Sequence, residues 1–402
     1  MSRQTGGLRI GIDGTCLASP RGYGRFLREL LPPLLADMGP DTYVLFVDEA
    51  VAATIELPDM PVRRLRTGES QAEAASGTGA RSPLDMWRMR QGVAAESLDV
   101  FYFPSVFSWF PVPGSLPTAV AIHDTIPERH GSIVFPHFWN RWAWQAKSWA
   151  ARRQARTIIT VSEFARKQIS DMFGVPEGDI YVTSPAPSSV FAPVSDPGGL
   201  TAWLETRGLP AGIRYFLFVG GVNPHKNVEG LVRGIAGLGP DARGRDAHLL
   251  LVGSYDTDSF HADSAAIRAE IDRTGLADRV HWTGFAPDEE LRHVYAGAVA
   301  VVLPAFEEGF GLPAVEAAAC GAPCIATRES PLPELLAGGG AFFDPTSPEQ
   351  LSEGLAKLWT DPVERDRLAA VATRRAAALD WKVAADVTRT ALRATAAAAR
   401  RA

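Results

Sequence analysis

The sequence predicts an α/β protein built from two domains, each containing a parallel sheet. Apolar runs rich in β-branched residues alternate with helical patterns through both halves of the chain. Such alternation is typical of parallel sheets with right-handed crossovers. A stretch rich in proline and glycine, 185–199, separates the halves and is the predicted linker. With 402 residues, the chain is long enough for two domains of ordinary size.

The first domain is predicted to span 1–188. Its expected strands are apolar runs at 8–13, 43–48, 118–123, 157–161 and 180–184. Its expected helices show helical periodicity and lie at 24–37, 139–155 and 163–173. The segment 67–81 has no periodicity and is expected to be a flexible loop.

The second domain is predicted to span 200–378, followed by an Ala/Arg-rich final helix at 379–402. Its expected strands lie at 215–219, 248–252, 280–282, 299–303 and 324–326, with helices between them.

The amino-acid composition favours a globular protein in water and argues against a nucleic-acid-binding, zinc-binding or membrane-spanning one. The content of 46% hydrophobic and 21% charged residues is that of a globular protein in water. A net charge of -6 gives no general attraction to nucleic acid, so no nucleic-acid partner is expected. The three cysteines lack the spacing of a zinc site. No secretory segment precedes the first predicted strand and no apolar run approaches the ~20 residues that span a bilayer, so a cytoplasmic protein is expected.

Two glutamates eight positions apart, Glu308 and Glu316, flank a glycine-rich turn. The apolar run before them, 298–305, is predicted to be a buried strand, and Pro313 suits the first position of a helix. Glu308 is therefore expected at the carboxyl end of a strand and Glu316 in the first turn of the next helix. Ligands of open α/β sheets bind at that edge, and helix N-termini attract anions. A sugar nucleotide fits both features, because its hydroxyls donate to carboxylates and its diphosphate accepts from amides.

This stretch resembles the retaining glycosyltransferases of family 4 (glycosyl transferases group 1). Their E-x7-E signature matches Glu308 and Glu316, and their glycine-rich turn matches 309–313. The resemblance implies the GT-B fold: two Rossmann-like α/β/α domains that face each other across a cleft, the first for the acceptor and the second for the nucleotide sugar. It also implies that 379–402 crosses back onto the first domain.

The resemblance further implies retaining transfer of a mannose- or glucose-type hexose from a nucleoside-diphosphate sugar. The acceptor would be a hydroxyl of a glycan, a glycolipid or a polysaccharide, and no metal or cofactor would be needed. Glu308 would hold a hydroxyl of the transferred sugar and Glu316 the ribose. The amides around Phe310, Gly311 and Leu312 would stabilise the leaving diphosphate.

A second glycine-rich turn, 220–227, contains Lys226 and follows the strand that opens the second domain. Such turns expose backbone N–H groups, and an ammonium group supplies a compact charge for phosphate. The resemblance implies that Lys226 neutralises the donor diphosphate. Many family members carry an arginine five residues earlier, where this chain has Gly221, so one cation fewer is expected here.

Three residues of the first domain are also candidates. Gly22 and Gly24 open a helix after the first strand, and His123 ends the strand 118–123. A Gly-x-Gly pattern is a weak signal by itself, and a lone histidine is more often structural. The resemblance implies that the glycines lie against the donor phosphates and acceptor, and that His123 faces the donor sugar.

Thr283 lies just after the short strand 280–282, whose end meets the nucleotide base in the family. Thr283 is therefore a candidate donor-binding residue. Its neighbours Trp282 and Phe285 are expected either to line the same pocket or to belong to the core, with the two interpretations equally supported.

Two other classes of function remain open. Asp256 and Asp258 form a D-x-D pattern that would hold a divalent cation in a metal-dependent GT-A transferase, although their place deep in the second half favours helix capping. A sugar phosphorylase is a related alternative. The second class is a non-catalytic protein that binds nucleotide sugars.

The segment 138–156 is basic and aromatic and has no acidic residue. Trp139, Trp142, Ala146 and Trp149 recur at spacings of three and four, so they are predicted to share one face of a helix. The favoured interpretation is that this face packs against the core. The alternative is contact with a membrane surface or a lipid-linked acceptor.

Overall fold

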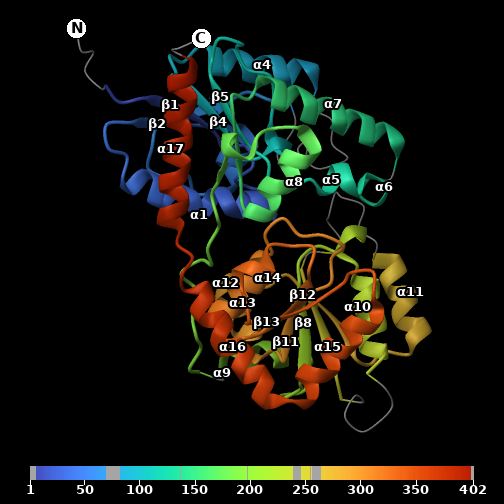
Figure 1. The fold of residues 1–402 in the computed structure, drawn as a ribbon. Coiled ribbons are helices and arrows are strands. Elements are labelled where there is room, and N and C mark those ends of the chain that lie inside the picture. Colours follow the sequence, from blue (N-terminus) through green and yellow to red (C-terminus); the bar gives the residue numbers. More distant parts are fainter. Residues whose placement is uncertain are drawn as a thin grey trace. The chain divides into compact units, whose positions relative to one another are not determined.

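The computed structural model describes residues 6–68, 82–135, 137–196, 198–238, 246–253, 255 and 264–399. It divides the chain into two compact units (Figure 1). Unit 1 comprises Met1–Pro185 and Trp381–Ala402, and unit 2 comprises Ala186–Asp380. The D-x-D pattern and most of the predicted loop 67–81 lie outside the described residues.

Unit 1 contains a seven-stranded sheet in which every neighbouring pair is parallel. The strand order is β3-β2-β1-β4-β5-β6-β7. The strands are β1 (Arg9–Asp13), β2 (Thr42–Asp48), β3 (Val62–Leu65), β4 (Val100–Phe103), β5 (Thr118–Ala121), β6 (Thr157–Thr160) and β7 (Ile180–Val182).

The helices of unit 1 connect these strands. Between β1 and β4 they are α1 (Gly22–Ala36), α2 (Glu49–Thr54) and α4 (Pro83–Ala94). Beyond β4 they are α5 (Ile126–Arg129), α6 (Gly131–Val134), α7 (Phe138–Gln154) and α8 (Glu163–Phe173), with short 3-10 turns at Val106–Ser108 and Glu177–Asp179.

The final helix, α17 (Trp381–Ala399), belongs to unit 1 although the whole of unit 2 precedes it in sequence. It packs against α1 and crosses it in Figure 1. Thr395 Oγ1 donates to Thr157 Oγ1 at 2.7 Å, which joins the helix to β6. Arg393 forms an ion pair with Asp41 at 2.9 Å between Nε and Oδ2.

The five strands expected in this half are present, and two more were missed. All four side chains of β4, Val-Phe-Tyr-Phe, are buried, so its sequence shows no alternation to mark it as a strand. Strand β3 was missed because it is too polar to be recognised as a strand: it is an edge strand with two exposed arginines in four residues. Its polar character is typical of a protected sheet edge.

Unit 2 contains a six-stranded parallel sheet in the order β10-β9-β8-β11-β12-β13. The strands are β8 (Tyr215–Val219), β9 (His248–Val252), β10 (Val280–Gly284), β11 (Ala300–Leu303), β12 (Cys324–Thr327) and β13 (Gly340–Phe343). The edge strand β13 was not predicted, because it is four residues long and begins within a run of three glycines.

The helices of unit 2 are α9 (Gly198–Glu205), α10 (Val228–Ala236), α11 (Ser264–Thr274), α12 (Asp288–Gly297), α13 (Leu312–Ala319), α14 (Leu332–Leu335), α15 (Pro348–Thr360) and α16 (Pro362–Ala376), with a 3-10 turn at Pro224–Lys226. Strand order reverses between β8 and β11, since β9 and β10 lie on one side of β8 and β11 on the other. Open parallel sheets bind ligands at the carboxyl ends of strands beside such a reversal.

The expected orientation of α7 is wrong. Trp139, Trp142 and Trp149 do not face the core but are 62–70% exposed. The buried side of the helix is formed by Trp144, Ser148 and Ala151. Tryptophans occur on both sides of this helix, so periodicity alone does not indicate which side is covered.

Candidate active site

An ion pair at the strand reversal of unit 2 forms the centre of the site. Lys226 ends the turn after β8, and Glu308 lies in the loop after β11. The Nζ atom of Lys226 lies 2.6 Å from Oε1 of Glu308. The Glu308 side chain is 12% exposed and that of Lys226 26%. The structure thus brings together two candidate residues that are 82 positions apart.

Hydrogen bonds hold the two loops in register. Asn227 Nδ2 donates to the Pro304 carbonyl at 3.1 Å, and the Phe306 amide donates to the His225 carbonyl at 2.9 Å. Asn227 has φ 52°, a left-handed conformation that asparagine tolerates better than most side chains. The Glu308 amide donates to the Glu329 carbonyl at 3.0 Å, which connects the loop to the end of β12.

The turn between Glu308 and α13 requires glycine at Gly311. Its φ is +83°, and an added Cβ would lie 2.8 Å from the Leu332 side chain. Gly311 is the N-cap of α13, and Pro313 falls in the first turn as expected. The first N–H groups of a helix have no intrahelical acceptor, so this end of α13 presents amides at the same sheet edge as Lys226.

Glu316 is the fifth residue of α13, slightly beyond the first turn in which it was expected. It is 2% exposed, and Tyr295 of α12 donates to it at 2.9 Å between Oη and Oε2. Tyr295 is itself fully buried and packs edge-on against Phe191. The tyrosine therefore holds one carboxylate oxygen of Glu316 in a defined orientation.

Tyr295→Phe is expected to weaken nucleoside-diphosphate binding about 2- to 10-fold, the range for one neutral hydrogen bond, if Glu316 binds the nucleotide. The substitution keeps the ring and its packing, so turnover at saturating donor should change little. Isothermal titration of the wild type, Tyr295→Phe, Glu316→Gln and the double variant measures the coupling. Fully additive losses in this cycle would contradict a positioning role.

In unit 1, the two candidate glycines differ in their surroundings. A Cβ on Gly24 would lie 2.2 Å from the Ser19 carbonyl oxygen, so α1 packs there only with glycine. A Cβ on Gly22, the first residue of α1, would meet no atom within 4 Å. Gly24 therefore has a packing role, whereas Gly22 leaves open space at the helix N-terminus.

His123 follows β5 and has a defined tautomer. Its Nε2 lies 2.9 Å from the Pro104 carbonyl oxygen, and the ring packs edge-on against Phe26 of α1. A carbonyl only accepts, so Nε2 carries the proton. Burial lowers the pKa of His123 to about 4, because it disfavours the charged form. The neutral ring then has Nδ1 as an acceptor for a hydroxyl.

Acid is expected to destabilise the protein through His123. Its pKa is about 4 in the folded chain against 6.5 ordinarily, so between these values only the unfolded chain binds the proton. This contribution to the free energy of unfolding is fully present above pH 6.5. It decreases as the pH is lowered from 6.5 towards 4, by at most ~1.4 kcal/mol per pH unit. His123→Gln can keep the bond to Pro104 and should flatten the fall of Tm between pH 7 and pH 5. Parallel Tm curves for variant and wild type would contradict this.

Thr283 lies near the end of β10, where its hydroxyl donates to the Leu251 carbonyl at 2.9 Å. Its aromatic neighbours have different environments. Trp282 packs edge-on against Tyr255 and lies beneath the Arg268 guanidinium, whereas Phe285 is 65% exposed. Of these two neighbours, Phe285 is the one with an open aromatic surface.

Two family profiles match the chain. The profile described as glycosyl transferases group 1 matches residues 202–375, and glycosyltransferase family 4 matches residues 22–186. The chain belongs to glycosyltransferase family 4. Its members are sugar-transferring enzymes, and the motifs at Lys226 and at Glu308 to Glu316 fall inside the first profile.

Curated relatives resemble about half of the chain. The O-antigen chain mannosyltransferase B of Escherichia coli is 31% identical over 228 residues, which are 57% of this chain and 58% of the relative. The D-inositol 3-phosphate glycosyltransferase of Thermobifida fusca is 32% identical over 216 residues, 51% of this chain and 49% of the relative. The match thus spans only about half the length of these relatives.

Solved structures show the GT-B fold. Sucrose-phosphate synthase of Thermosynechococcus elongatus gives a TM-score of 0.74 at 20% identity, covering 97% of this chain and 100% of the other. Anabaena HepE in complex with UDP-glucose gives 0.71 at 18% identity, covering 95% and 99%. The fold class predicted from the sequence is confirmed, and the GT-A alternative is wrong.

Sequence reasoning missed Tyr295 and Asn227, which orient Glu316 and the Lys226 turn. Asn227 had a signal, because asparagine after a glycine- and proline-containing turn favours a left-handed residue. Tyr295 had none, since nothing in the sequence pairs it with Glu316. Among the described residues, no cluster of three or more His, Cys, Asp or Glu side chains has the geometry of a metal site. No helix within that part of the chain combines the length and apolarity that crossing a membrane requires.

Proposed function

We propose that this protein transfers a mannose- or glucose-type hexose from a nucleoside-diphosphate sugar, with retention of configuration, to a hydroxyl of a glycan, a glycolipid or a polysaccharide. Family membership supports the reaction type. The mannosyltransferase and inositol-phosphate glycosyltransferase relatives support a hexose and a hydroxyl acceptor. The structure of HepE with UDP-glucose supports a nucleotide-sugar donor.

The observation that carries the proposal is the 2.6 Å pair between Lys226 and Glu308 beside the N-terminus of α13. An ammonium group has three donors, so Lys226 can keep one on Glu308 and direct the others to a phosphate. The second oxygen of Glu308 can accept from a sugar hydroxyl. The ammonium group of Lys226 then lies next to the bond that breaks, where negative charge develops on the leaving diphosphate.

The remaining donor contacts are assigned to unit 2. The amides around Phe310, Gly311 and Leu312 bind the diphosphate together with Lys226. Glu316, oriented by Tyr295, accepts from the ribose hydroxyls. Thr283 lies at the end of β10, on the same carboxyl edge of the sheet, and marks the position of the base.

Unit 1 is assigned to the acceptor, with Gly22 and Gly24 also contacting the donor phosphates and His123 the donor sugar. The open space at Gly22 admits a ligand to the N-terminus of α1, while Gly24 permits the close packing of that helix. His123 is neutral and accepts a hydrogen bond from a substrate hydroxyl through Nδ1. Because Nδ1 of the neutral ring is an acceptor, it suits a hydroxyl, which can donate to it, rather than a phosphate oxygen.

A thermal-shift panel of GDP-, UDP-, ADP- and dTDP-sugars, followed by NMR of the product, tests the proposal. A donor at 100 times its Kd stabilises the fold by about 2.7 kcal/mol, and one nucleotide should stand out. The product should keep the anomeric configuration of the donor. An inverted product would overturn the retaining assignment, phosphate-dependent turnover would indicate a phosphorylase, and binding without turnover would indicate a non-catalytic protein.

Turnover is expected to persist without a divalent metal. Lys226 and the amides of α13 supply the positive charge that a cation supplies in metal-dependent transferases. Initial rates measured in EDTA and in added Mn²⁺ should agree within about 2-fold, whereas a metal that took part in the reaction would change the barrier by several kcal/mol. Complete loss of turnover in EDTA, restored by Mn²⁺, would contradict this.

A further inference from the structure

The outward side of α7 carries four large aromatic side chains. Phe138, Trp139, Trp142 and Trp149 are 60–70% exposed. Phe138, Trp142 and Trp149 follow at intervals of four and seven, which places them on one side of a helix. The Phe138 and Trp139 rings contact each other at 4.2 Å between centroids. We call these four residues the aromatic face.

The opposite side of α7 fixes its orientation. Trp144 Nε1 and Ser148 Oγ both donate to Glu128 Oε1, at 2.9 and 2.8 Å. Lys147 Nζ donates to the Phe107 carbonyl at 2.6 Å. The helix is therefore held to unit 1 by partly buried hydrogen bonds as well as by the packing of Trp144, and the aromatic face cannot turn inward without breaking them.

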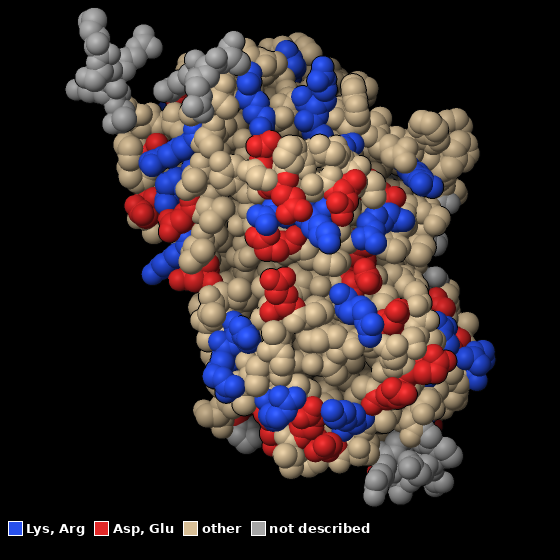
Figure 2. Space-filling model, viewed as in Figure 1, with Lys and Arg blue, Asp and Glu red and all other residues tan. Residues whose placement is uncertain are grey.

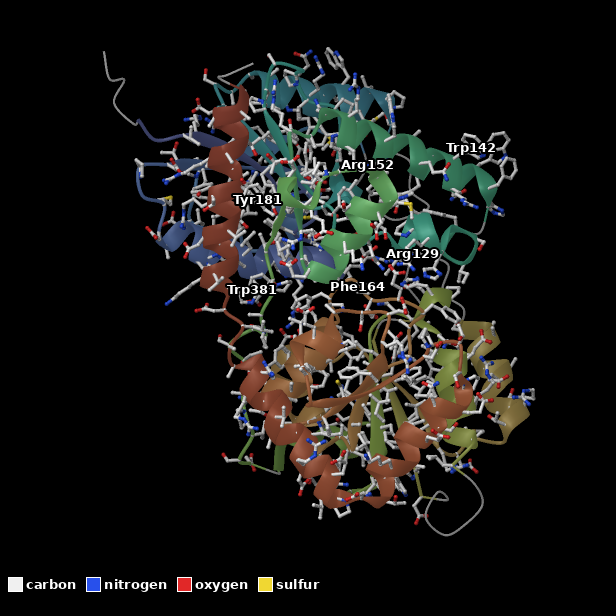
Figure 3. The ribbon with its side chains drawn as sticks, in the orientation of Figure 1. Arg129, Trp142, Arg152, Phe164, Tyr181 and Trp381 are labelled. Atoms are coloured by element: carbon white, nitrogen blue, oxygen red, sulfur yellow. The ribbon has the colours of Figure 1, made fainter. Side chains whose placement is uncertain are left out.

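The charged side chains of α7 and of the residues that flank it have one sign. Residues 137–156 contain no Asp or Glu, and their basic residues are Arg141, Lys147, Arg152, Arg153 and Arg156. Of these, Arg141, Arg153 and Arg156 are exposed. In Figure 3, Trp142 lies at the outer end of α7 and Arg152 nearer the sheet. Figure 2 shows that end of the helix as a largely uncharged projection of unit 1.

Exposed aromatic clusters of this kind mark interaction sites. Tryptophan and arginine are the residues suited to a membrane interface, where the apolar ring enters the acyl boundary and the guanidinium remains near the headgroups. Local positive charge on a chain of net charge -6 favours an anionic partner at this one surface. We propose that the aromatic face of α7 docks unit 1 on an anionic lipid bilayer, with the aromatic rings inserted and Arg153 and Arg156 at the headgroups.

Co-sedimentation of the full chain with vesicles tests this surface without any sugar donor, so its outcome is independent of the proposed transfer reaction. The wild type is expected to bind vesicles of phosphatidylcholine containing phosphatidylglycerol, more weakly as salt rises. Trp139→Ala with Trp142→Ala and Trp149→Ala should weaken binding at least about 30-fold, because binding scales with inserted apolar area. Phe285→Ala removes an aromatic of matching exposure from unit 2 and should leave vesicle binding unchanged.

A second variant tests the charge separately. Arg153→Gln with Arg156→Gln should weaken binding to the anionic vesicles about 30-fold, since each basic residue near such a surface contributes about 1 kcal/mol. It should have little effect on pure phosphatidylcholine. Circular dichroism and Tm verify that both variants fold.

Three outcomes would overturn the proposal. The first is a wild type that does not bind anionic vesicles even at low salt. The second is a folded triple variant that binds as well as the wild type. The third is a wild type that is dimeric in sedimentation and becomes monomeric in the triple variant, because the aromatic face would then be covered by a second copy of the chain.

Discussion

Glu308→Gln is expected to lower kcat by about 10- to 150-fold while leaving the affinity for free nucleoside diphosphate nearly unchanged. The reason is that Glu308 contacts the transferred sugar, and a charge-assisted hydrogen bond contributes about 1.5–3 kcal/mol. Contacts that strengthen as the glycosidic bond breaks appear in kcat rather than in binding. The substitution leaves Lys226 in place to contact the diphosphate, so nucleotide affinity should be retained.

Steady-state kinetics and titration with nucleoside diphosphate measure the two effects separately. Glu334→Gln is the matched control, because it removes one exposed carboxylate from α14 of the same unit. It should change neither quantity. If Glu308→Gln lost nucleotide affinity as strongly as Glu316→Gln, the assignment of Glu308 to the sugar would be wrong.

Lys226→Met is expected to weaken nucleoside-diphosphate binding by about 10- to 150-fold, because the diphosphate loses a charge-assisted contact. It also leaves the largely buried carboxylate of Glu308 without its cation. Removing one partner of such a pair destabilises the fold more than removing both. The variant should therefore also have a lower Tm than the wild type.

The double variant Lys226→Met with Glu308→Gln separates these two effects. Its Tm should recover part of the loss, since no uncompensated charge remains, while nucleotide affinity should stay low. Lys357→Met is the control, because this exposed lysine pairs with Glu364 on the surface of unit 2 and should alter affinity little. Unchanged nucleotide binding in Lys226→Met would remove this lysine from the phosphate site.

Much of the fold was predictable because the core strands follow simple rules. Runs such as 215–219 and 299–303 are apolar, short and followed by turn residues, and they form β8 and β11 within one residue of the predicted bounds. Strands β3 and β13 were missed because edge strands bury one side only and carry polar or glycine residues. Their presence depends on neighbouring strands rather than on their own composition.

The chemistry of the site was predictable only in part. The sequence alone identified the two glutamates, the lysine turn and the helix that starts at the glycine-rich loop, because each is a local pattern within one βα connection. The resemblance of these motifs to glycosyltransferase family 4 is supported by the two family profiles, which match both halves of the chain.

The sequence by itself determined that this protein has two parallel α/β domains, that carboxylates and a lysine lie at strand ends, and that 138–156 is an aromatic, basic helix. Tertiary structure alone decided that Lys226 pairs with Glu308, that Tyr295 orients Glu316, and that α7 turns its aromatic face outward. The physical reason is the same in each case. Periodicity and turn chemistry act over a few residues, whereas strand order and packing decide which distant side chains meet and which side of a helix is covered.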